Sequence, residues 1–214
     1  RPVLLLATSG TAPANWLPAV IEASMAGIPL ILISADRPPD LQGVGANQTI
    51  DQTRLFGTHV RASHNPGTPE AGFDPDYLHR LAARVFEQST WPHPGPVHIN
   101  QPFREPLLPG ADLPKPALLK KVSSKPPALL PDADSIQELA DAIAGRPGII
   151  VCGEMPATDG LPAALTALAA HLHCPIFAEP LSNLRYGPHD RSHLVVRYNA
   201  WLANRAFAAA HQPE

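Results

Sequence analysis

The chain has 214 residues, of which 44% are hydrophobic and 16% are charged, and its formal net charge is −3. This composition is typical of a globular protein with buried cores, and the mildly acidic balance does not favour a nucleic-acid or membrane surface. No apolar run in the sequence approaches the roughly 20 residues that a membrane-spanning helix needs.

The cysteine and histidine content indicates neither a disulfide framework nor a metal centre. The two cysteines, Cys152 and Cys174, match no zinc-binding spacing, so we expect reduced thiols. The ten histidines are scattered along the chain, and we expect most of them on the surface or in loops. We predict no metal ligands in this chain and a cytoplasmic location.

The first half of the chain alternates apolar runs with segments of helical periodicity. We expect strands at residues 3–7, 30–34, 59–62 and 97–100, the first with the composition of a central strand. We expect helices at residues 13–26, where Pro18 is able to introduce a kink, in a short turn near 52–56, and at 77–90 with Asp76 as N-cap. Strands that alternate with helices predict an α/β fold, a doubly wound parallel sheet with right-handed crossovers.

The second half begins with a stretch that a regular helix does not accommodate. Residues 101–131 are rich in Pro, Lys and Leu, which is typical of an extended linker. Beyond it we expect helices at residues 134–145, 161–172 and 199–210 and strands at 148–151 and 175–178. We therefore assign a first domain to residues 1–108, a linker to 109–131 and part of a second α/β domain to 132–214.

Two tight turns join a strand to a helix, Thr8-Ser9-Gly10-Thr11 and Cys152-Gly153. Backbone amides at a helix start attract anions, so both turns are candidates for a nucleotide site. The first turn lacks the lysine of a P-loop, and neither turn matches the G-x-G-x-x-G pattern. The pattern alone favours a plain tight turn over a phosphate site.

The exit of the second expected strand carries many polar side chains. The stretch reads LISADRPPDLQGVGANQTIDQ and places Asp36 and Arg37 at the strand end and Asn47 next to Gln48. Taken alone, these residues favour an ordinary surface ion pair and a turn-forming asparagine. They also suit a site for carboxylates and hydroxyls, because a guanidinium matches a carboxylate and amides bind polar groups without titrating.

Three stretches together resemble consecutive blocks of one enzyme family. They read TSGTAPANWLPAVIEA, PLILISADRPPDLQGVGANQTIDQ and GPVHINQPFREPL. In order and spacing they resemble the MenD family, the thiamine-diphosphate-dependent 2-succinyl-5-enolpyruvyl-6-hydroxy-3-cyclohexene-1-carboxylate synthases. The resemblance is strong over residues 2–108 and loose over 132–214. It implies that residues 1–108 are part of a pyrimidine-binding domain and that 132–214 are part of a central domain.

The resemblance implies a reaction and a set of substrate-binding residues. Members of the family act in menaquinone biosynthesis, where they decarboxylate 2-oxoglutarate and add the resulting succinyl carbanion to isochorismate. By resemblance, Arg37, Asn47 and Gln48 bind these anionic substrates. Asp36 is then expected either to hold the Arg37 side chain or to cap a backbone turn.

The resemblance also implies a cofactor, thiamine diphosphate with Mg²⁺ or Mn²⁺. The residues Thr8, Ser9, Gly10 and Thr11 are expected beside its aminopyrimidine ring rather than its diphosphate. Thr11 and Asn15 are the weaker candidates, because small polar residues near a helix start are usually caps.

Two parts of the family's active site have no counterpart in this sequence. In the family, a cofactor-activating glutamate precedes the first block, and a Gly-Asp-Gly motif for the metal and diphosphate lies far downstream. We therefore assign no catalytic residue. We expect that the chain is cut from a longer homo-oligomeric enzyme, a dimer or tetramer. We also expect that the isolated chain binds no cofactor and is inactive. We also expect an apolar sheet edge left open for self-association.

Two other interpretations stay open. The chain is alternatively a fragment of another thiamine-diphosphate lyase, of the acetolactate synthase type, which motifs upstream in the parent gene would reveal. It is otherwise a non-catalytic truncated chain that serves as an interaction unit, which the intact mass of the expressed protein would test.

Overall fold

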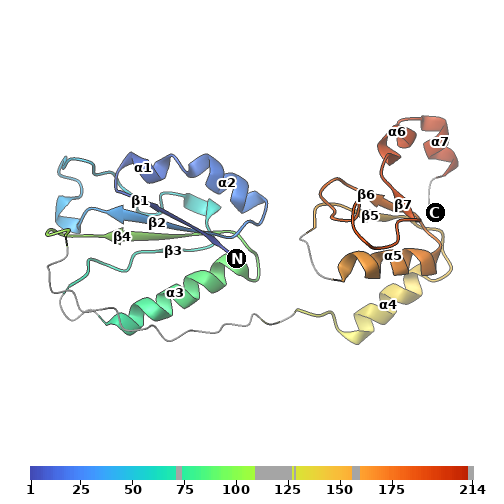
Figure 1. The fold of residues 1–214 in the computed structure, drawn as a ribbon, viewed down its shortest axis with the longest axis horizontal. Coiled ribbons are helices and arrows are strands. Elements are labelled where there is room, and N and C mark those ends of the chain that lie inside the picture. The colour runs from blue at the N-terminus through green and yellow to red at the C-terminus, as the bar shows by residue number, and fades with distance from the viewer. Residues whose placement is uncertain (71–73, 109–126, 128, 156–159, 212–214) are drawn as a thin grey trace. The chain divides into compact units, whose positions relative to one another are not determined.

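The computed structural model describes residues 1–70, 74–108, 127, 129–155 and 160–211. The chain divides into two compact units, residues 1–128 and 129–214 (Figure 1). All strand pairings described in both units are parallel, and helices connect most of the strands. These observations confirm the predicted α/β fold with parallel sheets. Most of the predicted linker, 109–131, lies outside the described residues.

The first unit contains a four-stranded sheet with helices on both of its faces. In spatial order its strands are β1 (Val3–Ala7), β2 (Leu30–Asp36), β4 (Pro96–Pro102) and β3 (Ser63–His64). Its helices are α1 (Thr11–Ala14), α2 (Leu17–Met25) and α3 (Pro75–Thr90), with the 3₁₀ turns η1 (Pro39–Leu41) and η2 (Gly57–His59). Figure 1 shows α1 and α2 on one face of the sheet and α3 on the other, so the sheet is doubly wound.

The apolar side chains of β2 alternate between the two faces, as the period of two in a strand requires. Leu32 packs with Val20 of α2 and with Phe56 in one core cluster. Ile31, its neighbour in the strand, packs on the other side with Val85 of α3. Both faces of β2 are therefore covered, which explains its nearly continuous apolar sequence.

The predicted helix over residues 13–26 is in fact two helices, α1 and α2. The break falls at Asn15 and Trp16, where the Trp16 N–H donates to the carbonyl of Pro13. Pro18 lies in the first turn of α2. A proline has no N–H to donate to the preceding turn, so it is better accommodated at a helix start than in the interior of a continuous helix.

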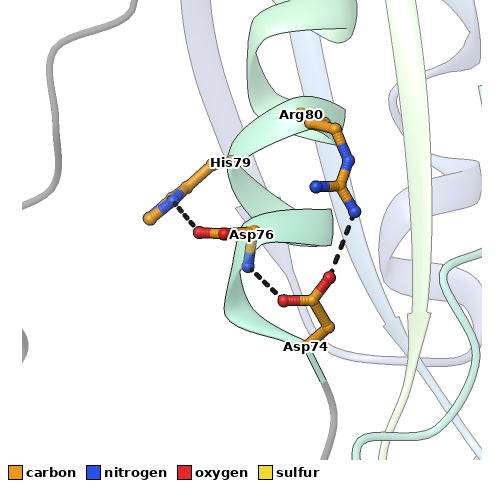
Figure 2. Close-up of polar contacts among 4 residues, drawn as sticks. All are labelled: Asp74, Asp76, His79 and Arg80. Atoms are coloured by element: carbon orange, nitrogen blue, oxygen red, sulfur yellow. Dashed lines mark hydrogen bonds and ion pairs between the residues drawn. The ribbon is translucent and has the colours of Figure 1, made fainter.

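The N-cap predicted for α3 is also wrong by two residues. Figure 2 shows that Asp74, not Asp76, caps the helix: its carboxylate accepts from the Asp76 N–H at 2.9 Å and from Arg80 at 3.1 Å. The backbone N–H of Asp76, followed by Arg80, lowers the pKa of Asp74. Pro75 occupies the first helical position, where its fixed φ favours helix, so the helix begins earlier than its apolar pattern suggests.

Strand β1 lies at an edge of the described sheet, where it pairs only with β2. Within the described residues, β1 thus lies at an edge although its composition is that of a central strand, and the sheet has the open apolar edge that was expected. Its side chains Val3, Leu4 and Leu6 are 56%, 61% and 76% exposed.

Other boundaries of the first unit differ from the predictions by a few residues. The predicted strand at 59–62 is displaced to the short β3, and the expected helical turn at 52–56 is an irregular turn that leads into η2. Strands β2 and β4 each run two residues beyond the predicted ends, so Asp36 belongs to β2.

Within its described residues, the second unit has a three-stranded sheet and four helices. Its strands, in the order β5-β6-β7, are β5 (Ile150–Cys152), β6 (Ile176–Ala178) and β7 (Leu194–Val195). Its helices are α4 (Ala133–Ile143), α5 (Leu161–Leu172), α6 (Tyr198–Leu202) and α7 (Arg205–Ala210). The predicted single helix at 199–210 is split because the Asn204 side chain caps α7.

The two cysteines lie in the core of the second unit as free thiols. Cys152 and Cys174 belong to one hydrophobic cluster with Ile176. Burial raises the pKa of the Cys152 thiol, so the neutral form is favoured there. Within the part of the chain that the structure describes, no helix is long and apolar enough to cross a membrane.

Candidate functional site

The predicted site residues gather at the carboxyl edge of the first sheet. The turn Thr8-Ser9-Gly10 follows β1, and Arg37 follows the last residue of β2, the neighbouring parallel strand. The carboxyl edge of parallel strands is where open α/β sheets commonly bind their ligands.

Gln48 joins the loop after β2 to the turn after β1. Its side-chain amide donates to Thr8 Oγ1 at 2.9 Å and to the Ser9 carbonyl at 3.1 Å, while Ser9 Oγ donates to the Gln48 carbonyl at 3.1 Å. Gly10 has φ +87°, and a Cβ at this position would lie 3.1 Å from Gln48 Cγ. The structure thus brings a residue predicted to bind substrate against three residues predicted to lie beside the cofactor.

Arg37 is half-buried, and its Nε has no hydrogen-bond acceptor within the described part of the chain. The carboxylate of Asp36 is engaged elsewhere: it accepts from the Arg37 backbone N–H at 2.7 Å, from Asn100 Nδ2 at 2.6 Å and from Gln42 Nε2 at 3.3 Å. The surface ion pair is therefore wrong, as is the alternative in which Asp36 holds the Arg37 side chain. Asp36 instead caps the backbone turn.

The remaining predicted residues lie at the same edge but are not drawn into these contacts. Asn47 is exposed, and its carbonyl accepts from Thr49 Oγ1 at 3.1 Å. Thr11 is exposed at the start of α1, where Gly10 is the N-cap. Asn15 Nδ2 donates to the Thr11 carbonyl at 2.9 Å, so Asn15 closes the C-terminal end of α1.

Beneath the turn lies a buried polar network that the sequence analysis missed. Gln52 Oε1 accepts from the Gly10 N–H at 2.8 Å, and Gln52 Nε2 donates to Asn100 Oδ1 at 2.8 Å. Ser34 Oγ donates to the same Asn100 oxygen at 2.8 Å and lies 2.8 Å from His98 Nε2. The exposed fractions of Gln52, Ser34, His98 and Asn100 are 1%, 0%, 0% and 3%.

The network fixes the tautomer of His98. Since the Ser34 hydroxyl proton is directed to Asn100, Ser34 Oγ must accept from His98, so the proton lies on Nε2. His98 Nδ1 is buried without a partner, and Phe56 packs edge-on against the ring at a centroid distance of 4.8 Å. Burial lowers the pKa of His98 to about 4, which keeps the ring neutral. His98 is thus an exception to the expectation that most histidines lie on the surface or in loops.

A sequence signal for the network was present. Ser34 and Asp36 alternate on β2, and His98 and Asn100 alternate on β4, in each strand at a spacing of two. Polar residues at this spacing face one side of a sheet together. Buried polar groups need partners, so two such pairs on neighbouring strands indicate a hydrogen-bonded network.

The turn after β1 offers an anion fewer donors than a regular helix start does. The Gly10 N–H already binds Gln52, Pro13 has no N–H, and α1 is only four residues long. Neither Gly10 nor Pro13 can therefore donate a backbone N–H to an anion, and Thr8 and Thr11 are exposed at the turn. Among the described residues, no group of three or more His, Cys, Asp or Glu side chains is arranged to hold a metal ion.

A separate cavity of about 670 Å³ lies in the second unit, between the C-terminal ends of α4 and α5. Its lining includes Arg146 and His171, together with apolar residues of both helices. The predicted site residues all belong to the first unit, so this cavity is a different feature from the candidate site.

Comparison with known proteins points to one family. Residues 1–55 match the family described as "Thiamine pyrophosphate enzyme, N-terminal TPP binding domain". The chain is 65% identical over 213 residues to a 2-succinyl-5-enolpyruvyl-6-hydroxy-3-cyclohexene-1-carboxylate synthase of Dechloromonas aromatica. The matched region covers 100% of this chain and 40% of that relative. It is 42% identical to the synthase of Myxococcus xanthus over 228 residues, with 100% of this chain and 38% of the relative covered.

The fold also has a counterpart among solved structures. An X-ray structure from Mycobacterium smegmatis, described as a thiamin diphosphate-dependent enzyme, matches with a TM-score of 0.65 over 85% of this chain and 33% of that chain. At 22% identity this likeness bears on the fold alone. The sequence comparisons carry further: over its whole length the chain is similar to the MenD family of 2-succinyl-5-enolpyruvyl-6-hydroxy-3-cyclohexene-1-carboxylate synthases, and its 214 residues span about 40% of the length of the first curated relative.

Proposed function

We propose that this chain is the part of a menaquinone-biosynthesis enzyme that binds substrate and the cofactor's aminopyrimidine. In the proposed reaction, 2-oxoglutarate loses carbon dioxide and its remaining four-carbon unit is added to isochorismate. The family gives the reaction class. The single observation in the fold that supports it is the half-buried Arg37, whose Nε has no acceptor in the described part of the chain.

An unpartnered guanidinium N–H in a buried position needs an acceptor. A buried donor without one costs about 1–3 kcal/mol, and more when the group is charged. Arg80 and Arg104 have carboxylate partners, Asp74 and Asp40, but no such partner is described for Arg37. Both proposed substrates carry carboxylates, which match the planar fork of a guanidinium. We therefore assign to Arg37 the binding of a substrate carboxylate.

Gln48 and Asn47 complete the proposed substrate-binding set. Gln48 reaches the turn after β1 while its own carbonyl is held by Ser9, so its position is fixed from both ends. Asn47 is exposed next to it and offers a neutral donor and acceptor to a hydroxyl or carboxylate. Neither amide titrates, so both would hold an anionic substrate without adding a charge.

The cofactor of the proposed reaction is thiamine diphosphate, with Mg²⁺ or Mn²⁺ anchoring the diphosphate elsewhere in the enzyme. When bound, it supplies the nucleophile and the electron sink that decarboxylation of a 2-oxo acid needs. The residues Thr8 to Thr11 would lie beside its ring. We expect a homo-oligomer in which the site is completed by another subunit, and a cytoplasmic location where both substrates are dissolved.

The test replaces Arg37 in a complete enzyme. We suggest a chimera in which this chain replaces the matching segment of the Dechloromonas aromatica synthase, because 65% identity makes the exchange conservative. Arg37→Ala should lower kcat/KM for isochorismate or 2-oxoglutarate at least about tenfold, since a hydrogen bond to a charged group contributes about 1.5–3 kcal/mol.

The matched control is Arg104→Ala, which removes an exposed arginine whose acceptor is Asp40. Its kinetics should stay within about twofold of wild type, because exposed ion pairs contribute little. If both substrates are turned over normally by Arg37→Ala, the assignment of Arg37 is wrong.

Gln48 is tested by a change of charge at nearly constant shape. Gln48→Glu places a carboxylate beside anionic substrates, and like charges disfavour binding. We expect a higher KM for at least one substrate with this variant. Normal turnover would identify Gln48 as a structural residue of the loop.

A further inference from the structure

The turn Thr8-Ser9-Gly10 is weakly held by its own sequence. Gly10 has φ +87°, a conformation that a glycine reaches easily and leaves as easily. No side chain caps the start of α1, which is only four residues long. The position of the turn must therefore be fixed by contacts from elsewhere in the fold.

A single buried side chain supplies such a contact. Gln52 is 1% exposed, and its Oε1 accepts from the Gly10 N–H at 2.8 Å. Gln52 lies only four positions beyond Gln48, the residue that contacts the outer side of the same turn. The loop from Gln48 to Gln52 therefore forms hydrogen bonds to the turn through both of its end residues.

The orientation of the Gln52 amide is itself determined. Its Nε2 donates to Asn100 Oδ1 at 2.8 Å and to the Ala35 carbonyl at 3.0 Å, with Ser34 Oγ as a more distant acceptor at 3.4 Å, so both amide protons are used. The Asn100 amide is oriented in turn by Asp36, whose carboxylate only accepts. The direction of these hydrogen bonds leaves Gln52 Oε1 facing Gly10.

We propose that Gln52 is a positioning residue of the site. It aligns the turn after β1 with Gln48 and, through Asn100 and Asp36, with the end of β2 that carries Arg37. This inference rests on the proposed function, because that proposal is what makes the turn and Gln48 part of a cofactor and substrate site.

The first test measures amide hydrogen exchange by NMR on the 214-residue chain and on Gln52→Met. The methionine keeps the length of the side chain and removes its hydrogen bonds. We expect the protection factor of the Gly10 amide to fall about tenfold. This factor corresponds to the loss of one hydrogen bond whose contribution is near the upper end of the usual range. The Leu32 amide, in the buried middle of β2, should stay within about twofold, since it does not depend on the turn.

Two variants make this test selective. Gln52→Glu keeps the shape of the side chain but turns a carboxylate oxygen toward two other acceptors, Asn100 Oδ1 and the Ala35 carbonyl. This variant should therefore also lower the protection factor of the Gly10 amide. It covers the case in which the methionine variant does not fold. Gln137→Met removes an amide of the same kind from α4, where its partner is the exposed Asp141. This control should leave Gly10 unchanged.

The second test asks whether the alignment matters for the site. In the chimera with the Dechloromonas aromatica synthase, Gln52→Met should raise KM for thiamine diphosphate several-fold more than it lowers kcat. Unchanged protection of Gly10, an equal loss at Leu32, or an unchanged KM in an active chimera would overturn the proposal. If the wild-type chimera does not convert the proposed substrates, the proposed function fails, and the exchange experiment still decides whether Gln52 holds the turn.

Discussion

Lowering the pH from 7 to 5 is expected to destabilise the first unit through His98. This side chain is 0% exposed, and burial lowers its pKa to about 4 from an ordinary value of 6.5. Because the pKa is lower in the folded state, the unfolded chain binds the proton more tightly. The stability that the neutral ring contributes is complete above pH 6.5 and is lost as the pH falls from 6.5 through 4.

The size of the effect follows from these two pKa values. One unit of pKa difference corresponds to about 1.36 kcal/mol, so the linkage relation gives a loss of about 2 kcal/mol at pH 5 and about 3 kcal/mol at pH 4. The carboxylate of Asp74 also has a lowered pKa, but its ordinary value is 3.8, so its contribution is lost at lower pH than that of His98. The interval from pH 6.5 to 5 is therefore the more selective one for His98.

The assay is urea denaturation followed by tryptophan fluorescence. Trp16 and Trp91 lie in the first unit and Trp201 in the second, so a Trp201→Phe background makes the fluorescence report on the first unit alone. In this background His98→Gln removes the titration and keeps an amide donor near Ser34. The free energy of unfolding of the parent should fall relative to this variant by about 2 kcal/mol between pH 7 and 5.

An exposed histidine of the same unit provides the control. His93→Gln should follow the pH dependence of the parent, because it leaves the buried ring in place. Parallel stability curves for the parent and His98→Gln between pH 7 and 5 would refute the reasoning, since they would mean that the buried ring takes up its proton as readily as in the unfolded chain.

Two further predictions use matched glycines. Gly10→Ala should lower the free energy of unfolding by about 1–3 kcal/mol more than Gly43→Ala in the same urea assay. Both glycines have positive φ, but only at Gly10 would the added methyl meet other atoms, at 3.1 Å, so equal losses would argue against the close approach. Gly95→Ala would bring a methyl within 2.5 Å of the Arg61 guanidinium, which donates to the backbone carbonyls of Ser24 and Pro94. This variant should lower the free energy of unfolding by about 1–2 kcal/mol, as measured by calorimetry. Gly148→Ala, with nothing within 4 Å, is its control, and an equal effect would contradict the role of Arg61.

The fold class could be predicted from the sequence because strands and helices have different apolar periods. The run that became β2 is apolar on both faces up to Ser34, β4 is apolar on the face of Val97 and Ile99, and α3 shows apolar residues on one side only, which together indicate a covered parallel sheet. Helix boundaries were less accessible. Pro18 and Pro75 each lie in the first turn of a helix, α2 and α3. The apolar pattern does not show this, because the first turn is defined by the backbone hydrogen bonds that begin there.

The candidate site residues were singled out in part from the sequence, and their roles stay predictions. Arg37 follows directly on β2, Gln48 lies in the polar loop beyond it, and it was the family resemblance that marked both as substrate-binding candidates. Gln52 did not stand out, because a glutamine in a loop is usually exposed. Its burial depends on Asn100, which lies 48 residues away in the sequence, and a contact of that range has no local signature. The pair of polar positions at a spacing of two on β2 and β4 was the available sign.

Identification of the product decides whether the proposed reaction is correct. The chimera is supplied with 2-oxoglutarate, isochorismate, thiamine diphosphate and Mg²⁺, and its products are analysed by mass spectrometry with carbon dioxide release measured in parallel. We expect one carbon dioxide to be released for each 2-succinyl-5-enolpyruvyl-6-hydroxy-3-cyclohexene-1-carboxylate formed, and we expect Arg37→Ala to lower the rates of both processes at least about tenfold. The absence of this product, or a preference for condensing two pyruvate molecules as in acetolactate synthesis, would contradict the proposed reaction.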